Sequence, residues 1–118
     1  MNLDEIVKEY STFDMTDGVE KLLRIRQNLS VLIVQITKVI ADLEEASKDA
    51  TATRKLEVAT SELSFEGAWA ERKNRAILAC ETEILSESQI EGSLKAYRIK
   101  FEGMKELSNS MSSYLNKM

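Results

Sequence analysis

The sequence contains no histidine, no proline and only one cysteine among its 118 residues. Without histidine, neither a Cys/His zinc site nor the Glu-x-x-His pairs of helical di-metal sites can be built. Histidine is also the usual acid–base catalyst at neutral pH, and the sequence has no Walker loop or glycine-rich dinucleotide turn to bind phosphates. We therefore predict that the chain is not an enzyme and carries no metal or cofactor.

The missing proline and the four glycines predict long, uninterrupted helices, because proline is the common breaker of helices. The length fits one domain, so residues 1–118 are expected to form a single helical domain. No run approaches the about 18 apolar residues of a membrane span, and the acidic start of the chain, MNLDE, differs from a basic secretion signal. We expect a cytoplasmic protein with no membrane contact, and a lone cysteine suits that reducing compartment.

Apolar residues recur at seven-residue spacing over residues 16–50, and a second row follows three positions further on. This is the a/d pattern of a helix that packs along its whole length. The stripe is too wide for one partner helix, and Val31 and Val34 add apolar surface outside it. Because large uncovered apolar surfaces are rare on soluble monomers, we predict a homo-oligomer. The residues predicted to form the oligomer interface are Leu29, Leu32, Ile33, Ile36, Val39 and Ile40.

Capping signals predict where the first helices lie. Asn2, followed three residues later by a glutamate, has capping-box spacing and predicts a short N-terminal helix over residues 3–11. A second signal at Asp17 predicts a long helix over residues 17–47. Residues 47–53 are polar and weakly helical, so they are predicted to form a loop, with a continued helix as the alternative.

Seven-residue spacing returns over residues 54–84 and predicts a further long helix, which contains Gly67. This glycine marks either a close helix crossing or a tolerated imperfection. Ser86 or Ser88 is then expected to begin the last helix, since both have capping-box spacing and an apolar stripe follows to the end of the chain. We therefore predict an all-α fold, an antiparallel helical hairpin or three-long-helix bundle with coiled-coil character and a short N-terminal helix.

Cations gather on the last two predicted helices, although the net charge of −4 does not indicate a strongly basic nucleic-acid binder. If these helices pack antiparallel, their cations form one stripe that can bind phosphates; ordinary solvation and ion pairing with neighbouring glutamates is the alternative. Trp69, Tyr97 and Phe101 have the chemistry to stack on bases, but their helical spacing favours the core. Cys80 is predicted to be a buried structural thiol. The predicted nucleic-acid-binding residues are Arg72, Lys73, Arg75, Lys95 and Arg98.

An apolar helix is thus followed by an Ala/Arg/Lys-rich segment, AERKNRA at residues 70–76, and by a serine-capped helix with LKAY at residues 94–97 and Leu/Met repeats. Over residues 59–118 this layout resembles small all-helical phage accessory proteins of DNA replication and recombination regions, including mediators that load a recombinase on single-stranded DNA. The resemblance implies an oligomer in the host cytoplasm that contacts single-stranded DNA through basic residues, and the acidic net charge departs from it. Secreted helical hairpins with a Trp-x-Gly turn are set aside, because Gly67-Ala-Trp69 reverses that order within a predicted helix.

Two classes of function follow from these observations. In the first, the protein is a non-enzymatic, oligomeric accessory factor that acts on single-stranded DNA or on a DNA-bound enzyme. In the second, it is a protein-binding module, such as a phage inhibitor of a host defence system or a structural assembly component. Salt-dependent binding to single-stranded DNA distinguishes the two classes.

Overall fold

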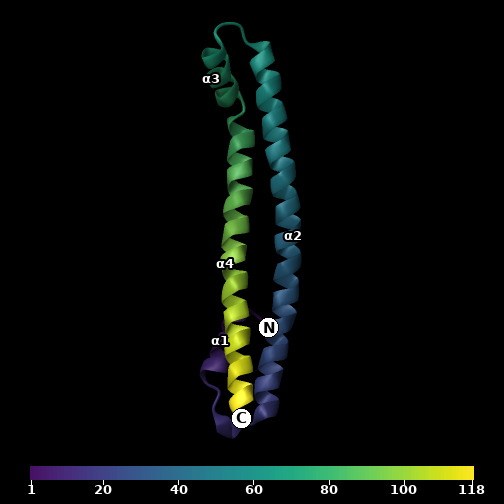
Figure 1. Cartoon of the computed structure of the whole chain (residues 1–118), viewed down its shortest axis with the longest axis vertical. Helices are drawn as coiled ribbons and strands as arrows, with labels where there is room; N and C mark the ends of the chain where they lie inside the picture. The colour runs from purple at the N-terminus through teal and green to yellow at the C-terminus, as the bar shows by residue number, and fades with distance from the viewer. The chain divides into compact units, whose positions relative to one another are not determined.

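A computed structural model describes all residues, 1–118, and 90% of them are helical, with no strand (Figure 1). The elements are α1 (Leu3–Ser11), a short 3-10 helix η1 (Met15–Asp17), α2 (Val19–Ser64), α3 (Trp69–Ala79) and α4 (Glu81–Lys117). The predicted all-α fold with its short N-terminal helix is confirmed. No helix combines the length and the apolar composition that a membrane crossing demands.

The chain divides into two compact units, to which α2 and α4 both contribute. The terminal unit consists of Met1–Ile40 and Tyr97–Met118, and the central unit consists of Ala41–Ala96. The expectation that residues 1–118 form a single domain stays a prediction. In the central unit α2 is followed, after a short turn, by α3 and the start of α4, which run back along it as a helical hairpin (Figure 1).

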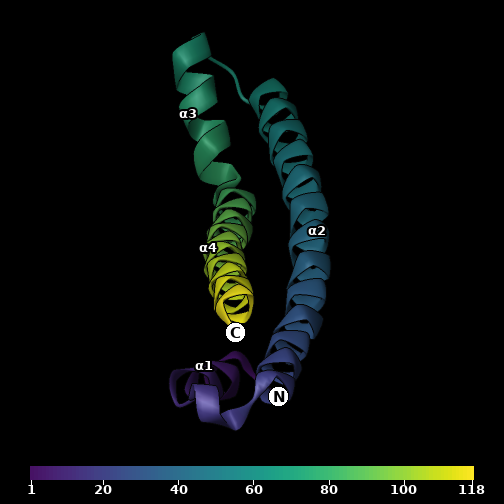
Figure 2. The ribbon, with the colours of Figure 1, turned by 60° about the horizontal axis from the view of Figure 1, so that its bottom comes forward.

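The core of the terminal unit lies between α1, the first half of α2 and the second half of α4 (Figure 2). The buried residues of α2 follow the seven-residue spacing of the sequence, since one face of the helix points inward along its length. α4 contributes methionines, whose flexible side chains fill irregular gaps. The buried core residues, all at most 5% exposed, are Ile6, Leu22, Ile25, Leu29, Ile36, Met104 and Met111.

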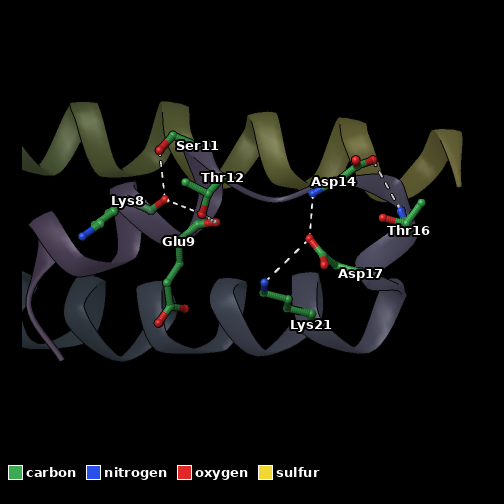
Figure 3. Close-up of polar contacts among 8 residues, drawn as sticks. All are labelled: Lys8, Glu9, Ser11, Thr12, Asp14, Thr16, Asp17 and Lys21. Carbon is green, nitrogen blue, oxygen red and sulfur yellow. Dashed lines mark hydrogen bonds and ion pairs between the residues drawn. The ribbon is translucent and has the colours of Figure 1, made fainter.

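α1 begins and ends where side chains satisfy its free backbone groups. The Asn2 side-chain oxygen accepts from the Glu5 backbone N–H at 2.9 Å, as the capping spacing predicts. At the other end the Ser11 hydroxyl donates to the Lys8 carbonyl oxygen at 2.9 Å (Figure 3). A helix of nine residues needs tertiary contacts to persist, and the fully buried Ile6 supplies them.

Two aspartates organise the turn between α1 and α2. The Asp14 backbone N–H donates to Asp17 Oδ2 at 2.8 Å, and the same oxygen lies 3.6 Å from Lys21 Nζ (Figure 3). Gly18 follows with a φ of +87°, a conformation that L side chains rarely adopt. α2 therefore begins at Val19, two residues after the aspartate that was predicted to start it.

The central unit has a thinner core than the terminal unit. Its buried apolar residues are Ala76, Cys80 and Leu94, two of which have small side chains. Across the hairpin, Arg54 Nε donates to Glu87 Oε2 at 2.8 Å, and this hydrogen bond raises the pKa of Arg54. Two antiparallel helices cannot enclose each other, so several leucines of this unit remain exposed.

Residues 47–53 are helical, so the predicted loop is wrong and its alternative, a continued helix, is correct. The segment contains no glycine or proline, and alanine makes up two of its seven residues, so nothing in the backbone forces the helix to end. The Arg54–Glu87 ion pair follows directly and holds this part of α2 against α4.

The turn of the hairpin lies inside the segment that was predicted to be one helix over residues 54–84. α2 ends at Ser64 and α3 begins at Trp69, and Gly67 between them has a φ of +117°. Both explanations that placed this glycine inside a helix are therefore wrong, because it takes the left-handed conformation of a chain reversal.

α4 begins earlier than the capping signals predicted. Its first residue is Glu81, so Ser86 and Ser88 both lie inside the helix and neither starts it. Cys80 alone separates α3 from α4, and backbone hydrogen bonds between residues four apart continue on both sides of it. Its side chain is 3% exposed and lies 3.4 Å from the Ser61 hydroxyl, which confirms the predicted buried thiol.

Candidate nucleic-acid interface on α3

α3 has eleven residues and carries three of the five predicted nucleic-acid-binding residues, Arg72, Lys73 and Arg75. No side chain caps its start. Ala68 precedes it in an extended conformation, and the Ala68 carbonyl oxygen accepts the Arg72 backbone N–H at 2.9 Å. Glu71 lies in the first turn, where a negative charge is favoured by the helix dipole. The turn before α3 and this helix start together determine where the three cations lie.

Trp69, the only tryptophan of the chain, lies at the surface at the start of α3. Its side chain is 65% exposed and that of Leu63, at the end of α2, is 84% exposed. Sequence spacing predicted a buried Trp69, and this is wrong because the α2–α3 turn brings it to the tip of the hairpin. Both residues line a pocket of about 250 Å³, whose other lining residues are Ala59, Glu62 and Arg72.

The three cations of α3 differ in their contacts. The Lys73 ammonium lies 4.9 Å from the centroid of the Trp69 ring, a cation–π contact that holds a positive charge beside the exposed aromatic side chain. Arg75 Nη2 lies 3.0 Å from Glu71 Oε1 in an exposed pair one turn apart, which contributes little stability. The Nε atom of Arg72 is buried without a hydrogen-bond partner, and this residue lines the pocket. Leaving a buried donor unpaired costs free energy.

Lys95 and Arg98 do not join the α3 cluster. Both are exposed on α4, Lys95 in the central unit and Arg98 in the terminal unit. The predicted basic stripe required the two helices to pack antiparallel, but α4 instead continues from α3 in the same general direction (Figures 1 and 2). Along these consecutive helices, Arg75 and Lys95 are about 30 Å apart. The structure therefore brings together three of the five predicted residues.

The predicted oligomer interface on α2 is largely internal. Leu29 and Ile36 belong to the core of the terminal unit, where Leu32, Ile33 and Ile40 pack partly buried against it. Of the six predicted residues, Val39 alone is exposed, at 37%. Outside this stripe Val31 and Val34 are 52% and 71% exposed, as their positions predicted. α1 and α4 pack against this stripe within the chain, and the homo-oligomer stays a prediction.

Leu63 is a member of the pocket that sequence analysis did not single out as a site residue. The spacing gave no signal for its exposure, because the helix predicted over residues 54–84 places Leu63 on the row that is expected to pack, whereas in the structure this helix ends at Ser64. Leu63 belongs to the intact row and still remains 84% exposed.

No protein-family model, curated protein or solved structure matches the chain. Gly67-Ala-Trp69 lies in the turn between α2 and α3, so one reason for setting aside the secreted Trp-x-Gly hairpins is gone. The reversed order of tryptophan and glycine is the reason that remains.

Proposed function

We propose that this protein is a non-enzymatic, helical accessory factor of DNA replication or recombination that contacts single-stranded DNA through α3. The observation that carries the proposal is the exposed Trp69, with Arg72, Lys73 and Arg75 within the next two turns of the same helix. Unpaired bases stack on exposed aromatic rings, and neighbouring cations neutralise the backbone phosphates.

Single strands fit this arrangement better than a duplex. In a duplex the base faces are stacked inside the helix, where a surface tryptophan does not reach them. The central unit also carries twelve carboxylates and seven cations, so a wide electrostatic contact with duplex phosphates is unfavourable there. The DNA contact is therefore short. The three cations of α3 bind phosphates although the rest of the unit is acidic, and base stacking supplies much of the affinity.

A protein partner is the second candidate, and one observation favours it. Leu63 and Leu56 are 84% and 66% exposed on the same unit, and large apolar side chains that lie at the surface are typical of binding sites. Tryptophan and arginine are also the residues most enriched among the energetically dominant contacts of protein interfaces. In this alternative, a partner side chain occupies the pocket between Leu63, Trp69 and Arg72.

The single tryptophan provides the test, because its fluorescence reports only on this site. We expect a short oligothymidine to quench the emission of Trp69 in a saturable manner. For three phosphate contacts, the logarithm of the binding constant is expected to fall with the logarithm of salt concentration with a slope of about −2, roughly −0.7 per contact. A duplex of the same length is expected to quench much less.

Unchanged fluorescence over the whole titration, together with free migration of the labelled oligonucleotide in a gel, would contradict DNA binding at α3. That result would leave the protein partner as the use of the pocket. Binding in the gel without a change in Trp69 emission would place the DNA elsewhere on the chain and would equally contradict the proposal.

A further inference from the structure

The pocket at the turn of the hairpin has one charged and one apolar side chain on each of its two walls. Glu62 and Leu63 belong to the last turn of α2, and Trp69 and Arg72 belong to the start of α3. Its volume of about 250 Å³ is smaller than the about 300–1,000 Å³ of pockets that enclose drug-sized ligands. The pocket therefore fits one small, flat group, and all of its lining residues belong to the central unit.

The two charged residues of the pocket do not neutralise each other. Glu62 and Arg72 are both half-buried, and neither forms an ion pair or a side-chain hydrogen bond within the chain. Elsewhere on α3, by contrast, Arg75 is paired with Glu71 at 3.0 Å. A carboxylate only accepts hydrogen bonds and a guanidinium only donates them. The pocket therefore offers an unused acceptor on one wall and an unused donor on the other.

These features favour a neutral, flat group over an ion. A phosphate carries acceptors alone, and the carboxylate of Glu62 would repel its charge. A cation would in the same way be repelled by Arg72. A nucleobase is neutral, its edge carries both donors and acceptors, and its faces stack on aromatic rings such as that of Trp69. An unpaired base is therefore the part of a single strand that matches the pocket.

We propose that this pocket takes one unpaired base of the bound strand and prefers cytosine to thymine. The inference rests on the proposed single-stranded DNA contact at α3 and adds a base preference to it. On the pairing edge of cytosine an amino group lies beside two acceptors, so Glu62 accepts from the amino group and Arg72 donates to the acceptors. Thymine has a carbonyl oxygen in place of the amino group, and its only donor lies between two such oxygens, which the carboxylate of Glu62 repels.

The other two cations of α3, Lys73 and Arg75, lie outside the pocket lining and can contact phosphates. The guanidinium of Arg72 has several N–H donors besides the buried Nε, enough for a base and a neighbouring phosphate. Phosphate binding weakens as the salt concentration rises, whereas hydrogen bonds to a neutral base release no counterions. The affinities for cytosine and thymine strands are therefore expected to fall together with salt, while their ratio stays constant.

Titration of Trp69 fluorescence with oligodeoxycytidine and with oligothymidine of the same length tests the preference, because the two bases have similar size. At neutral pH the wild type is expected to bind oligodeoxycytidine about fivefold or more tightly, the lower end for one discriminating base contact. Glu62→Gln is expected to bind both strands with affinities within about twofold of each other, since an amide donates to thymine as well as accepting from cytosine. Glu66→Gln is the matched control. It removes the same charge from an exposed position in the turn, outside the pocket lining, and is expected to keep the wild-type ratio.

A failure of the base preference can be told apart from a failure of the DNA contact. Equal affinities of the wild type for the two strands would refute the preference and leave the DNA contact intact. A preference for oligodeoxycytidine that Glu62→Gln retains, or that Glu66→Gln loses as well, would show that Glu62 does not select the base and would also refute the proposal. Absence of binding to either strand, in fluorescence and in a gel, would overturn the proposal together with the DNA contact at α3.

Discussion

Replacing Leu29 by alanine is expected to lower the free energy of unfolding by about 2–5 kcal/mol, the range for removing a large apolar side chain from a packed core. Leu29 is 0% exposed and belongs to the core that α1, α2 and α4 form in the terminal unit. The truncation leaves a cavity that these helices cannot fill by small movements. Urea unfolding followed by circular dichroism measures the loss, and Val34→Ala, at a position that is 71% exposed on the same helix, is expected to change stability by less than about 0.5 kcal/mol.

The same experiment decides whether Leu29 acts within one chain or between chains. If it serves the internal core, the unfolding midpoint of Leu29→Ala relative to wild type is independent of protein concentration. If it instead lined a subunit contact, as its sequence pattern first suggested, the difference would grow or shrink with concentration. Equal midpoints for Leu29→Ala and Val34→Ala would contradict the core that the structure describes.

Removing the three cations of α3 together is expected to weaken binding to single-stranded DNA by about tenfold or more at low salt and to flatten its salt dependence. The Arg72→Ala/Lys73→Ala/Arg75→Ala variant keeps Trp69, so fluorescence titration reports on both proteins. Alanine favours helices, and the one ion pair lost with these residues is exposed, so α3 is expected to persist.

Three lysines of the terminal unit provide a control with the same loss of charge. Lys8, Lys38 and Lys117 are all exposed, and replacing them by alanine changes the net charge of the protein as much as the α3 variant does. This control is expected to bind DNA with an affinity within about twofold of wild type, since long-range contributions are screened by salt. An equal loss in both variants would show that binding depends on overall charge, with no particular role for α3.

Much of the fold could be predicted from local sequence patterns. The first helix begins and ends at the predicted residues. Its start could be predicted because the Asn2 side chain caps it through a hydrogen bond to a residue only three positions away. The core stripe of α2 follows from periodicity alone, which needs no knowledge of the partner. Periodicity does not show which helices pack against the stripe. The sequence pattern therefore predicted a second copy as the partner, whereas in the structure α1 and α4 pack against it within the chain.

The helix boundaries after residue 47 depend on features that one-dimensional patterns leave ambiguous. A polar, alanine- and threonine-containing stretch fits a loop and a solvated helix equally well, and the long-range Arg54–Glu87 pair is not visible in the spacing. A glycine such as Gly67 can occur in a helix interior or in a chain reversal, and the sequence alone does not distinguish the two. Its φ of +117° in the structure shows the chain reversal. The serine capping boxes near residue 86 were overridden because α4 had already begun at Glu81.

The candidate site, like the fold, could be predicted from the sequence only in part. The cations of α3 were visible in the sequence, but the exposure of Trp69 depends on the position of the turn.

The central claim, that single-stranded DNA binds at the α3 end of the central unit, is tested most directly by hydrogen–deuterium exchange with and without oligothymidine. Slower exchange is predicted over residues 62–79, which contain Leu63, Trp69 and the three cations, because a bound strand excludes water and stabilises the turn and α3. No change is predicted in residues 19–40 of α2. Protection confined to the terminal unit, or identical exchange in both states at saturating oligothymidine, would contradict the claim.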